Sequence, residues 1–315
     1  MTRIALLDDY QNIALSMADW SVLSEASITV FNHPLGGPAE VAAALRDFNI
    51  IGIMRERTPF PRRLLEKLPE LKLLVTTGMR NPSIDLDAAR ELGVTVCGTD
   101  GSGHPAAELT WGLILGLMRH IPREDREMRA GHWQTALGHD LNGKTLGVIG
   151  LGRLGSRVAQ VGAAFDMEVI AWSPNLTPER AAAADARLVS KEELLSKADV
   201  ITLHIVLSER THGLLGAAEF ALMKPTAYLI NTSRGPLIDE SALVNTLHEG
   251  RIAGAALDVY DYEPLPAGHP LRRLANTVLT PHIGYVTTET YRVFYRQMVQ
   301  DIRAYLDGAT IRILT

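Results

Sequence analysis

The segment LGVIGLGRLGSRVAQVGAAF, residues 146–165, constrains the fold more than any other part of the chain. Its apolar start is typical of a buried parallel strand. Gly150, Gly152 and Gly155 follow at G-x-G-x-x-G spacing, and apolar residues then recur at helical intervals. In such a unit the glycines permit a tight turn, close approach of a pyrophosphate, and packing of the helix on the strand, while free N–H groups at the helix start bind the anion. The segment predicts a dinucleotide site; the alternative is an ordinary glycine-rich turn.

Composition argues against several other classes of protein. A length of 315 residues favours two domains, and 46% apolar with 21% charged residues is typical of globular proteins. The net charge is −5 and Lys and Arg are scattered along the sequence, so the chain lacks the clustered basic residues expected of a nucleic-acid-binding protein. A single cysteine, Cys97, excludes an internal disulfide and a cysteine-rich metal cage, and we expect no metal. With no membrane-spanning run and no signal-peptide pattern, we expect a cytoplasmic protein.

Alternating strands and helices predict two α/β units with parallel sheets. In the first unit we expect strands at 3–7, 28–31, 50–54, 71–76 and 94–97, and helices at 38–48, 61–68 and 84–92. The second unit begins at Lys144 and contains the glycine-rich segment. Its later strands are expected at 169–172, 200–204, 227–231, 255–259 and 277–279, with helices at 191–196, 219–223 and 241–249.

The segments that join these units predict a discontinuous first domain. Residues 99–105, TDGSGHP, form a candidate hinge. An apolar helix at 106–120 and an irregular charged passage to Asn142 follow, and the last helix, 288–307, precedes an apolar tail, IRIL, that could pack on the first unit. We therefore expect two Rossmann-like domains. Residues 1–103 and 289–315 would form a smaller, flavodoxin-like substrate-binding domain, and residues 104–288 a doubly wound dinucleotide-binding domain, with a small ligand between them.

Polar side chains follow three of the expected strands. Arg234 comes just after YLIN, Asp258 and Glu263 end or follow GAALDV, and His282 follows TVLT. Ligands of open α/β sheets bind beyond the carboxyl ends of the strands. Arginine can bind a carboxylate through two parallel hydrogen bonds, and histidine can transfer a proton that a neighbouring carboxylate helps to orient. Each residue alone could be an ordinary surface group, but their joint position beside a dinucleotide site favours a catalytic set.

The chain resembles the D-isomer-specific 2-hydroxyacid dehydrogenase family in five ordered segments: LNGKTLGVIGLGRLG, ADVITLHIVLSERTHGLL, LINTSRGPLIDESAL, RIAGAALDVYDYEPLP and TPHIG. The resemblance implies hydride transfer between NAD(P)H and a 2-oxo acid or D-2-hydroxy acid. It also implies that Arg234 binds the substrate carboxylate and carbonyl, that His282 protonates the carbonyl oxygen during reduction, and that Glu263 holds His282 protonated and oriented. A twofold homodimer through the cofactor domains is implied as well, and the 106–120 helix, apolar on more than one face, supports it.

Further binding residues follow from the resemblance and from positions near the glycine-rich turn. The expected cofactor contacts are Gly150, Gly152, Arg153, Leu154, Gly155, Ser173, Asn175, His204, Thr211, Thr232, Asp258 and Gly284. The expected substrate contacts are Gly78, Met79 and Arg80, in a loop whose backbone N–H groups would hold the carboxylate, and Tyr285, which would narrow the pocket.

Two departures from the family pattern leave cofactor and substrate open. Ser173 stands where many members carry an acidic residue, roughly 20 residues after the glycines. Because serine does not repel a 2′-phosphate, NADP(H) is permitted, with Arg153 and Arg180 as candidates for binding it, and the preference stays undecided. Arg80 replaces a glycine and would either recognise a second acidic group on the substrate or form a surface ion pair. A non-catalytic NAD(H)-sensing scaffold of the same fold is the alternative function.

Overall fold

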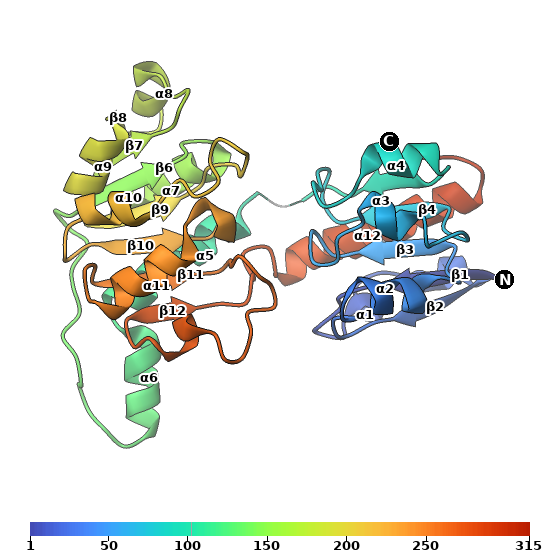
Figure 1. Ribbon diagram of the computed structural model, residues 1–315, viewed down its shortest axis with the longest axis horizontal. Helices are drawn as coiled ribbons and strands as arrows, with labels where there is room; N and C mark the ends of the chain where they lie inside the picture. The colour runs from blue at the N-terminus through green and yellow to red at the C-terminus, as the bar shows by residue number, and fades with distance from the viewer. Residues whose placement is uncertain (102) are drawn as a thin grey trace. The chain divides into compact units, whose positions relative to one another are not determined.

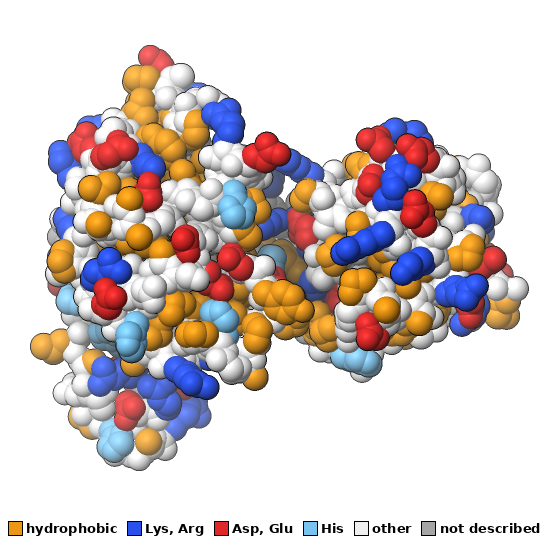
Figure 2. All heavy atoms as spheres, in the orientation of Figure 1, with side chains coloured by type: hydrophobic (Ala, Val, Ile, Leu, Met, Phe, Trp, Pro, Cys, Tyr) orange, Lys and Arg blue, Asp and Glu red, His pale blue; other side chains and the backbone are white. Residues whose placement is uncertain are grey.

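The computed structural model describes residues 1–101 and 103–315, which form two compact α/β units (Figure 1). Unit 1 comprises Met1–Ser102 and Val286–Thr315, and unit 2 comprises Gly103–Tyr285. The candidate hinge at 99–105 includes Ser102, which lies outside the described residues. On the face seen in Figure 2, acidic and basic side chains are interspersed on both units. None of the described helices combines the length and apolar character needed to cross a membrane.

Unit 1 contains a five-stranded parallel sheet in the order β2-β1-β3-β4-β5, the flavodoxin-like order expected from the sequence. The strands are β1 (Thr2–Leu6), β2 (Ala26–Val30), β3 (Ile50–Ile53), β4 (Leu73–Thr76) and β5 (Thr95–Gly98). The helices are α1 (Ala14–Met17), α2 (Pro38–Leu45), α3 (Arg62–Leu65), α4 (Leu86–Glu91) and α12 (Thr288–Leu306), with a 3-10 turn, η1 (Trp20–Leu23).

The central strands of unit 1 are buried on both faces, which explains their continuous apolar sequence. One face packs around Phe60, Leu74 and Val96. On the other, Gly52 leaves room for α12, because a Cβ at Gly52 would lie 2.5 Å from Sδ of Met298. The helix that follows unit 2 in the sequence therefore completes the core of unit 1.

The C-terminal tail adds to the edge of this sheet beside β5, as expected. Leu314 N donates to Val96 O (2.8 Å), and Gly98 N donates to Arg312 O (2.9 Å). Arg312 also pairs with the buried Asp301 of α12, at 3.0 Å from Oδ1, whereas Oδ2 has no hydrogen-bond partner among the described residues. Burial raises the pKa of Asp301 to about 7, although the charge of Arg312 acts against this rise.

Unit 2 contains a seven-stranded parallel sheet in the order β12-β11-β10-β9-β6-β7-β8, the expected doubly wound arrangement. The strands are β6 (Thr145–Ile149), β7 (Glu168–Trp172), β8 (Arg187–Leu188), β9 (Val200–Leu203), β10 (Tyr228–Asn231), β11 (Gly254–Leu257) and β12 (Thr277–Leu279). The helices are α5 (Pro105–Met118), α6 (Ile121–Arg129), α7 (Arg153–Ala164), α8 (Pro178–Ala182), α9 (Lys191–Lys197), α10 (Ala217–Leu222) and α11 (Glu240–His248), with 3-10 turns η2 (Gly235–Leu237) and η3 (Pro270–Arg273).

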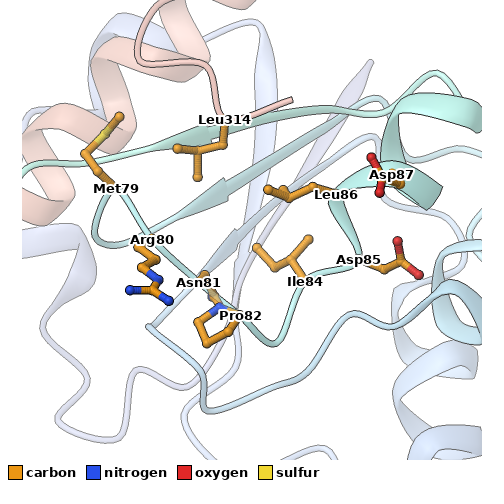
Figure 3. A pocket seen from close by; sticks show the side chains of 9 residues that line it. All are labelled: Met79, Arg80, Asn81, Pro82, Ile84, Asp85, Leu86, Asp87 and Leu314. Carbon is orange, nitrogen blue, oxygen red and sulfur yellow. The ribbon is translucent and has the colours of Figure 1, made fainter. Parts of the chain in front are cut away.

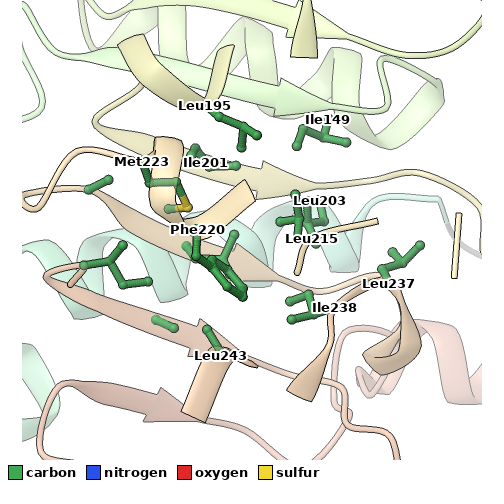
Figure 4. Close-up of a cluster of buried hydrophobic side chains, with 14 of the residues drawn as sticks. Ile149, Leu195, Ile201, Leu203, Leu215, Phe220, Met223, Leu237, Ile238 and Leu243 are labelled. Carbon is green, nitrogen blue, oxygen red and sulfur yellow. The ribbon is translucent and has the colours of Figure 1, made fainter. Parts of the chain in front are cut away.

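The cores on the two faces of this sheet account for its apolar helices. On one face, Phe220 packs among leucine and isoleucine side chains that include Leu203 and Leu215 (Figure 4). On the other, α5 is buried, and Trp111 stacks at 5.1 Å from the ring of Phe165. The apolar side chains of α5 are thus largely covered within unit 2, so this helix does not by itself require a partner subunit.

The passage expected to be irregular contains a helix, α6, and here the sequence-based interpretation was wrong. Apart from Pro122, its only large apolar residues are Ile121 and Met128, both exposed, so too few apolar side chains mark the helix in the sequence. It begins after His120, whose φ of 54° lies in the left-handed region, and Pro122 follows at the start of the helix. Beyond α6, Trp133 and Leu137 are exposed.

Candidate active site

The glycine-rich turn between β6 and α7 has the geometry that its spacing predicts. Gly150 has a φ of +99°, and a Cβ there would lie 2.6 Å from the carbonyl carbon of His204. A Cβ at Gly155 would collide with the carbonyl oxygen of Gly150, whereas a Cβ at Gly152 would meet no atom within 4 Å. Gly152 precedes α7 without a side-chain cap, and no acidic residue lies in the first turn of the helix. Open space beside uncapped N–H groups fits a pyrophosphate.

The loop after β7 lies directly over this turn. Ser173 Oγ accepts a hydrogen bond from the backbone N–H of Leu151 (3.1 Å). Two residues on, the carbonyl oxygen of Asn175 accepts from Nη1 of Arg180 (3.4 Å). The guanidinium of Arg180 therefore lies at the same loop as Ser173, where the sequence places the ribose of a dinucleotide.

The segment after β9 carries two more of the expected cofactor contacts. The ring nitrogen Nε2 of His204 lies 2.9 Å from Thr202 Oγ1, and burial lowers the pKa of His204 to about 4. Its imidazole is therefore neutral at physiological pH. Thr211 Oγ1 donates to Val206 O (2.8 Å) and accepts from Ser208 N (2.8 Å), which closes the loop that follows.

The turn that carries Arg234 is shaped by Asn231, a buried residue at the end of β10. Its Oδ1 accepts from Ser233 N (3.0 Å), and its Nδ2 donates to Arg234 O (2.9 Å). Arg234 Nη1 donates to Ser233 O (2.6 Å), and Thr232 Oγ1 lies 2.8 Å from Thr110 Oγ1 of α5. Sequence reasoning did not assign Asn231 a role, although an amide that ends an apolar strand was a usable signal.

Asp258, at the end of β11, holds the loop that carries His282. Its Oδ1 accepts from Thr280 Oγ1 (2.6 Å) and from Ile283 N (2.8 Å), and its Oδ2 accepts from Gly284 N (2.8 Å). Burial raises the pKa of Asp258, while these hydrogen bonds act in the opposite direction. Both carboxylate oxygens of Asp258 thus accept hydrogen bonds within unit 2. The sequence separately predicts that Asp258 contacts the cofactor.

Glu263 and His282 form a direct pair. His282 Nδ1 lies 2.6 Å from Glu263 Oε2, and Oε1 of the same carboxylate accepts from Tyr260 N (3.0 Å). His282 has a φ of 53°, in the left-handed region that non-glycine residues seldom adopt. The ring of Tyr285 stands edge-on to the imidazole at 5.6 Å. With Nδ1 engaged, Nε2 is the imidazole atom that makes no hydrogen bond with a described residue.

The expected substrate loop lies in unit 1, after β4. Gly78 has a φ of +90°, and a Cβ there would collide with the guanidinium of Arg55, a residue that sequence reasoning missed. The backbone N–H of Gly78 donates to Thr99 Oγ1 (3.0 Å) and is therefore already engaged. The backbone N–H groups of Met79 and Arg80 make no hydrogen bond with the described residues, so these two are the N–H groups that the loop can offer to a ligand.

Arg80 borders a cavity of about 540 Å³ that lies wholly within unit 1 (Figure 3). The cavity is lined by Met79, Arg80, Asn81, Pro82, Ile84, Asp85, Leu86, Asp87 and Leu314. The Arg80 side chain is exposed and forms no ion pair with any described residue. The structure therefore gives no support to a surface ion pair, one of the two roles expected for Arg80.

The sheet of unit 2 ends in two features of a dehydrogenase: a dinucleotide turn after β6, and a histidine–carboxylate pair beyond the carboxyl ends of the neighbouring strands β11 and β12. The family model for the D-isomer specific 2-hydroxyacid dehydrogenase, NAD binding domain, matches residues 111–284. The chain belongs to this family, and its resemblance to the family is confirmed.

Relatives and solved structures agree with this membership. The chain is 39% identical over 255 residues to a glyoxylate reductase of Aeropyrum pernix, covering 78% of this chain and 76% of the relative. It is 38% identical over 273 residues to a D-3-phosphoglycerate dehydrogenase of Methanocaldococcus jannaschii, covering 85% of this chain but only 52% of that longer protein. The crystal structure of a putative D-3-phosphoglycerate dehydrogenase from Ralstonia solanacearum superposes with a TM-score of 0.93 at 36% identity, covering 100% and 97% of the two chains.

Proposed function

We propose that this chain is an NAD(P)-dependent D-2-hydroxyacid dehydrogenase, which interconverts a small 2-oxo acid and its D-2-hydroxy acid. The observation that carries the proposal is the 2.6 Å pair of Glu263 Oε2 and His282 Nδ1, in the unit that also holds the glycine-rich turn. A scaffold that only senses NAD(H) does not need such a pair but can retain one, and the assay described below separates the two functions. Bound NAD(P)H supplies the hydride for reduction of the 2-oxo acid.

The proton moves at Nε2 of His282. Because Nδ1 is held by Glu263, the opposite nitrogen faces away from the carboxylate and can protonate the carbonyl oxygen as the hydride arrives at the carbon. The hydrogen bond from Tyr260 N fixes the second oxygen of Glu263, so the carboxylate cannot rotate away from the ring. In the oxidative direction the same nitrogen, unprotonated, accepts the hydroxyl proton.

Arg234 binds the substrate carboxylate and carbonyl oxygen. Its planar guanidinium offers parallel N–H groups that match a carboxylate, and Asn231 holds its backbone at the end of β10. Unit 1 carries its own candidate substrate contacts, namely the N–H groups of Met79 and Arg80 and the Arg80 guanidinium, which favours a substrate with a second acidic group. Tyr285, edge-on to His282, limits the width of the site.

The residues around the glycine-rich turn fit a dinucleotide. The uncapped start of α7 beside Gly152 would hold the pyrophosphate, and Ser173, which accepts from Leu151 N, would lie beside the ribose. Ser173 carries no charge to repel a 2′-phosphate, and Arg180 lies at the same loop. NADPH is therefore accepted alongside NADH.

A panel assay tests this function. Glyoxylate, hydroxypyruvate, pyruvate and a dicarboxylic 2-oxo acid are each offered with NADH and with NADPH, and loss of cofactor absorbance is followed. We expect turnover of at least one acid, and a kcat/KM for reduction that falls as pH rises. Glu263→Gln should move that falling limb to lower pH, because the charge that favours the imidazolium is gone. Glu249→Gln, an exposed control, should leave it in place. Cofactor binding without turnover of any acid would favour the scaffold.

The same proposal includes a homodimer formed through unit 2, in the cytoplasm. Support for the dimer comes from α6 and the segment after it, where Ile121, Met128, Trp133 and Leu137 are exposed at 54%, 57%, 74% and 92%. A second copy of the chain would cover these apolar side chains. Light scattering at micromolar concentration should give twice the chain mass, and a monomer mass would contradict the dimer.

A further inference from the structure

We propose that Glu240 is a positioning residue of the candidate active site, which couples the segment that carries Arg234 to the segment that carries Glu263. The inference rests on the proposed function, because it assigns those two residues to catalysis. It concerns residues 232–240 and residues 259–270, both within unit 2.

Glu240 bridges the two segments with both of its carboxylate oxygens. It is the first residue of α11, after the N-cap Asp239. Its Oε1 lies 3.0 Å from His269 Nε2, and its Oε2 accepts from Asp261 N at 3.4 Å. His269 Nδ1 accepts from Leu271 N (3.4 Å), so the ring proton belongs on Nε2 and points at Glu240. The Glu240 and His269 side chains are only 22% and 18% exposed.

The same two segments are also in backbone contact, at Gly235. A Cβ at Gly235 would collide with the carbonyl group of Tyr260, so only glycine allows this approach. Gly235 directly follows Arg234, and Tyr260 N is the donor to Glu263 Oε1. Residues 260 and 261 therefore connect the Glu240 bridge on one side to the Glu263 carboxylate on the other. Release of that bridge would let the Glu263 carboxylate drift from His282.

Further contacts hold the far end of the Glu263 segment. Arg272 donates to Leu265 O (2.8 Å) and to Pro266 O (3.0 Å). The near end is also held, because the Tyr260 hydroxyl donates to Leu257 O (3.1 Å) and to Thr280 O (2.9 Å). Between these two ends, Glu240 is the described residue that accepts from Asp261 N and holds the middle of the segment.

An acidic residue in the first turn of a helix also stabilises the helix through its dipole, and the variants separate the two roles. Glu240→Asp keeps the charge at the helix start but is one methylene too short to reach His269. Glu240→Gln keeps the reach but loses the charge, and its single acceptor oxygen can take only one of the two donors, the ring N–H of His269 or the backbone N–H of Asp261. If Glu240 acts by positioning, Glu240→Gln should retain more activity than Glu240→Asp. If Glu240 acts only through the helix dipole, Glu240→Asp should retain more activity than Glu240→Gln.

The charged groups around the bridge and the catalytic pair bear on any pH readout. Asp261, whose pKa is raised first by burial and then by Glu240, also faces Asp239, His212 and His269. Around His282 the groups are Glu263 and the buried Asp258. Glu240→Asp keeps the negative charge beside these groups, so a displaced limb in the pH profile of that variant reports the geometry of the catalytic pair. In Glu240→Ala and Glu240→Gln the charge that raises the pKa of Asp261 is lost as well.

The first experiment measures kcat and KM against pH for whichever 2-oxo acid the parent reduces. We expect Glu240→Asp and Glu240→Ala to lower kcat about tenfold and to move the falling limb to lower pH, with KM for the cofactor unchanged. Glu240→Gln should stay within about threefold of the parent. Glu249→Asp, at the other end of α11, is the matched control. His269→Ala combined with Glu240→Ala should cost no more than Glu240→Ala alone, because Glu240→Ala already removes the contact that His269→Ala removes.

A second readout does not depend on activity. In protein with labelled histidines, the His282 ring signal is assigned by its loss in His282→Gln, and at fixed pH its chemical shift should change in Glu240→Asp but not in Glu249→Asp. If the parent reduces no 2-oxo acid, the proposed function fails but this signal still decides the positioning role. A folded Glu240→Asp or Glu240→Ala protein with the parental His282 signal and kcat would overturn the inference. If Glu240→Ala does not fold, the comparison of Asp with Gln decides it.

Discussion

The buried carboxyl group of Asp301 should make unit 1 less stable as pH rises. Its pKa is about 7 in the folded chain against an ordinary value of 3.8, so between these values the folded state binds more protons than the unfolded state. Stability therefore falls as pH increases through this window and levels off above it. Three pH units at about 1.4 kcal/mol each give a loss of about 4 kcal/mol by neutral pH.

Asp301→Asn removes the charge and keeps an oxygen that can accept from Arg312. We expect the variant and the parent to be about equally stable near pH 4, and the variant to gain about 4 kcal/mol over the parent by pH 8. Hydrogen exchange of the β5 amides reports on unit 1 without requiring the whole chain to unfold in one step. Asp307→Asn, on an exposed residue just after the same helix, is the control. Parallel loss of protection in parent and Asp301→Asn from pH 4 to pH 8 would refute the reasoning.

Three other predictions concern the site. Gly152→Ala should change the free energy of unfolding by no more than about 0.5 kcal/mol but weaken cofactor binding. Gly155→Ala should destabilise the fold by about 1–3 kcal/mol, because the added Cβ would collide with the backbone at this position, whereas the Cβ added by Gly152→Ala would not. Calorimetry measures the change in stability and cofactor titration the change in binding. Arg234→Lys should lower kcat/KM by about 2 kcal/mol, roughly 30-fold, and near-parental kinetics would remove Arg234 from the site. Ser173→Asp should shift cofactor preference toward NADH by about 1 to 4 kcal/mol, measured as the ratio of kcat/KM values; a parent that already rejects NADPH would contradict this.

The sheets could be predicted because their signals are local. Gly150, Gly152 and Gly155 lie within six residues and fix the strand–turn–helix unit from which the rest of the second sheet follows. The helix α6 was missed because its sequence is mostly charged: apart from Pro122, Ile121 and Met128 are its only large apolar residues.

The candidate site was less accessible to sequence reasoning where its parts depend on distant partners. The pairing of Glu263 with His282 follows from the family resemblance. That Gly78 cannot offer its N–H to a substrate depends on Thr99, twenty-one residues away, and no local pattern indicates it. The bridge from Glu240 to His269 spans twenty-nine residues and two elements, so only the folded chain brings it together.

The route of the chain through unit 1 also has a consequence for biosynthesis. Strands β1 to β5 leave the ribosome first, but α12, which covers one face of their sheet at Gly52, is made only after all of unit 2. At ordinary translation rates the interval is roughly 10 to 40 s. During this interval, Phe60 and its neighbours can pack on one face of the sheet of unit 1. The opposite face, which Met298 of α12 later covers, stays open to water and to other nascent chains. Unit 2 can thus finish folding before the unit that precedes it, and until α12 is made the unfinished first sheet exposes the kind of apolar surface that promotes aggregation of nascent chains.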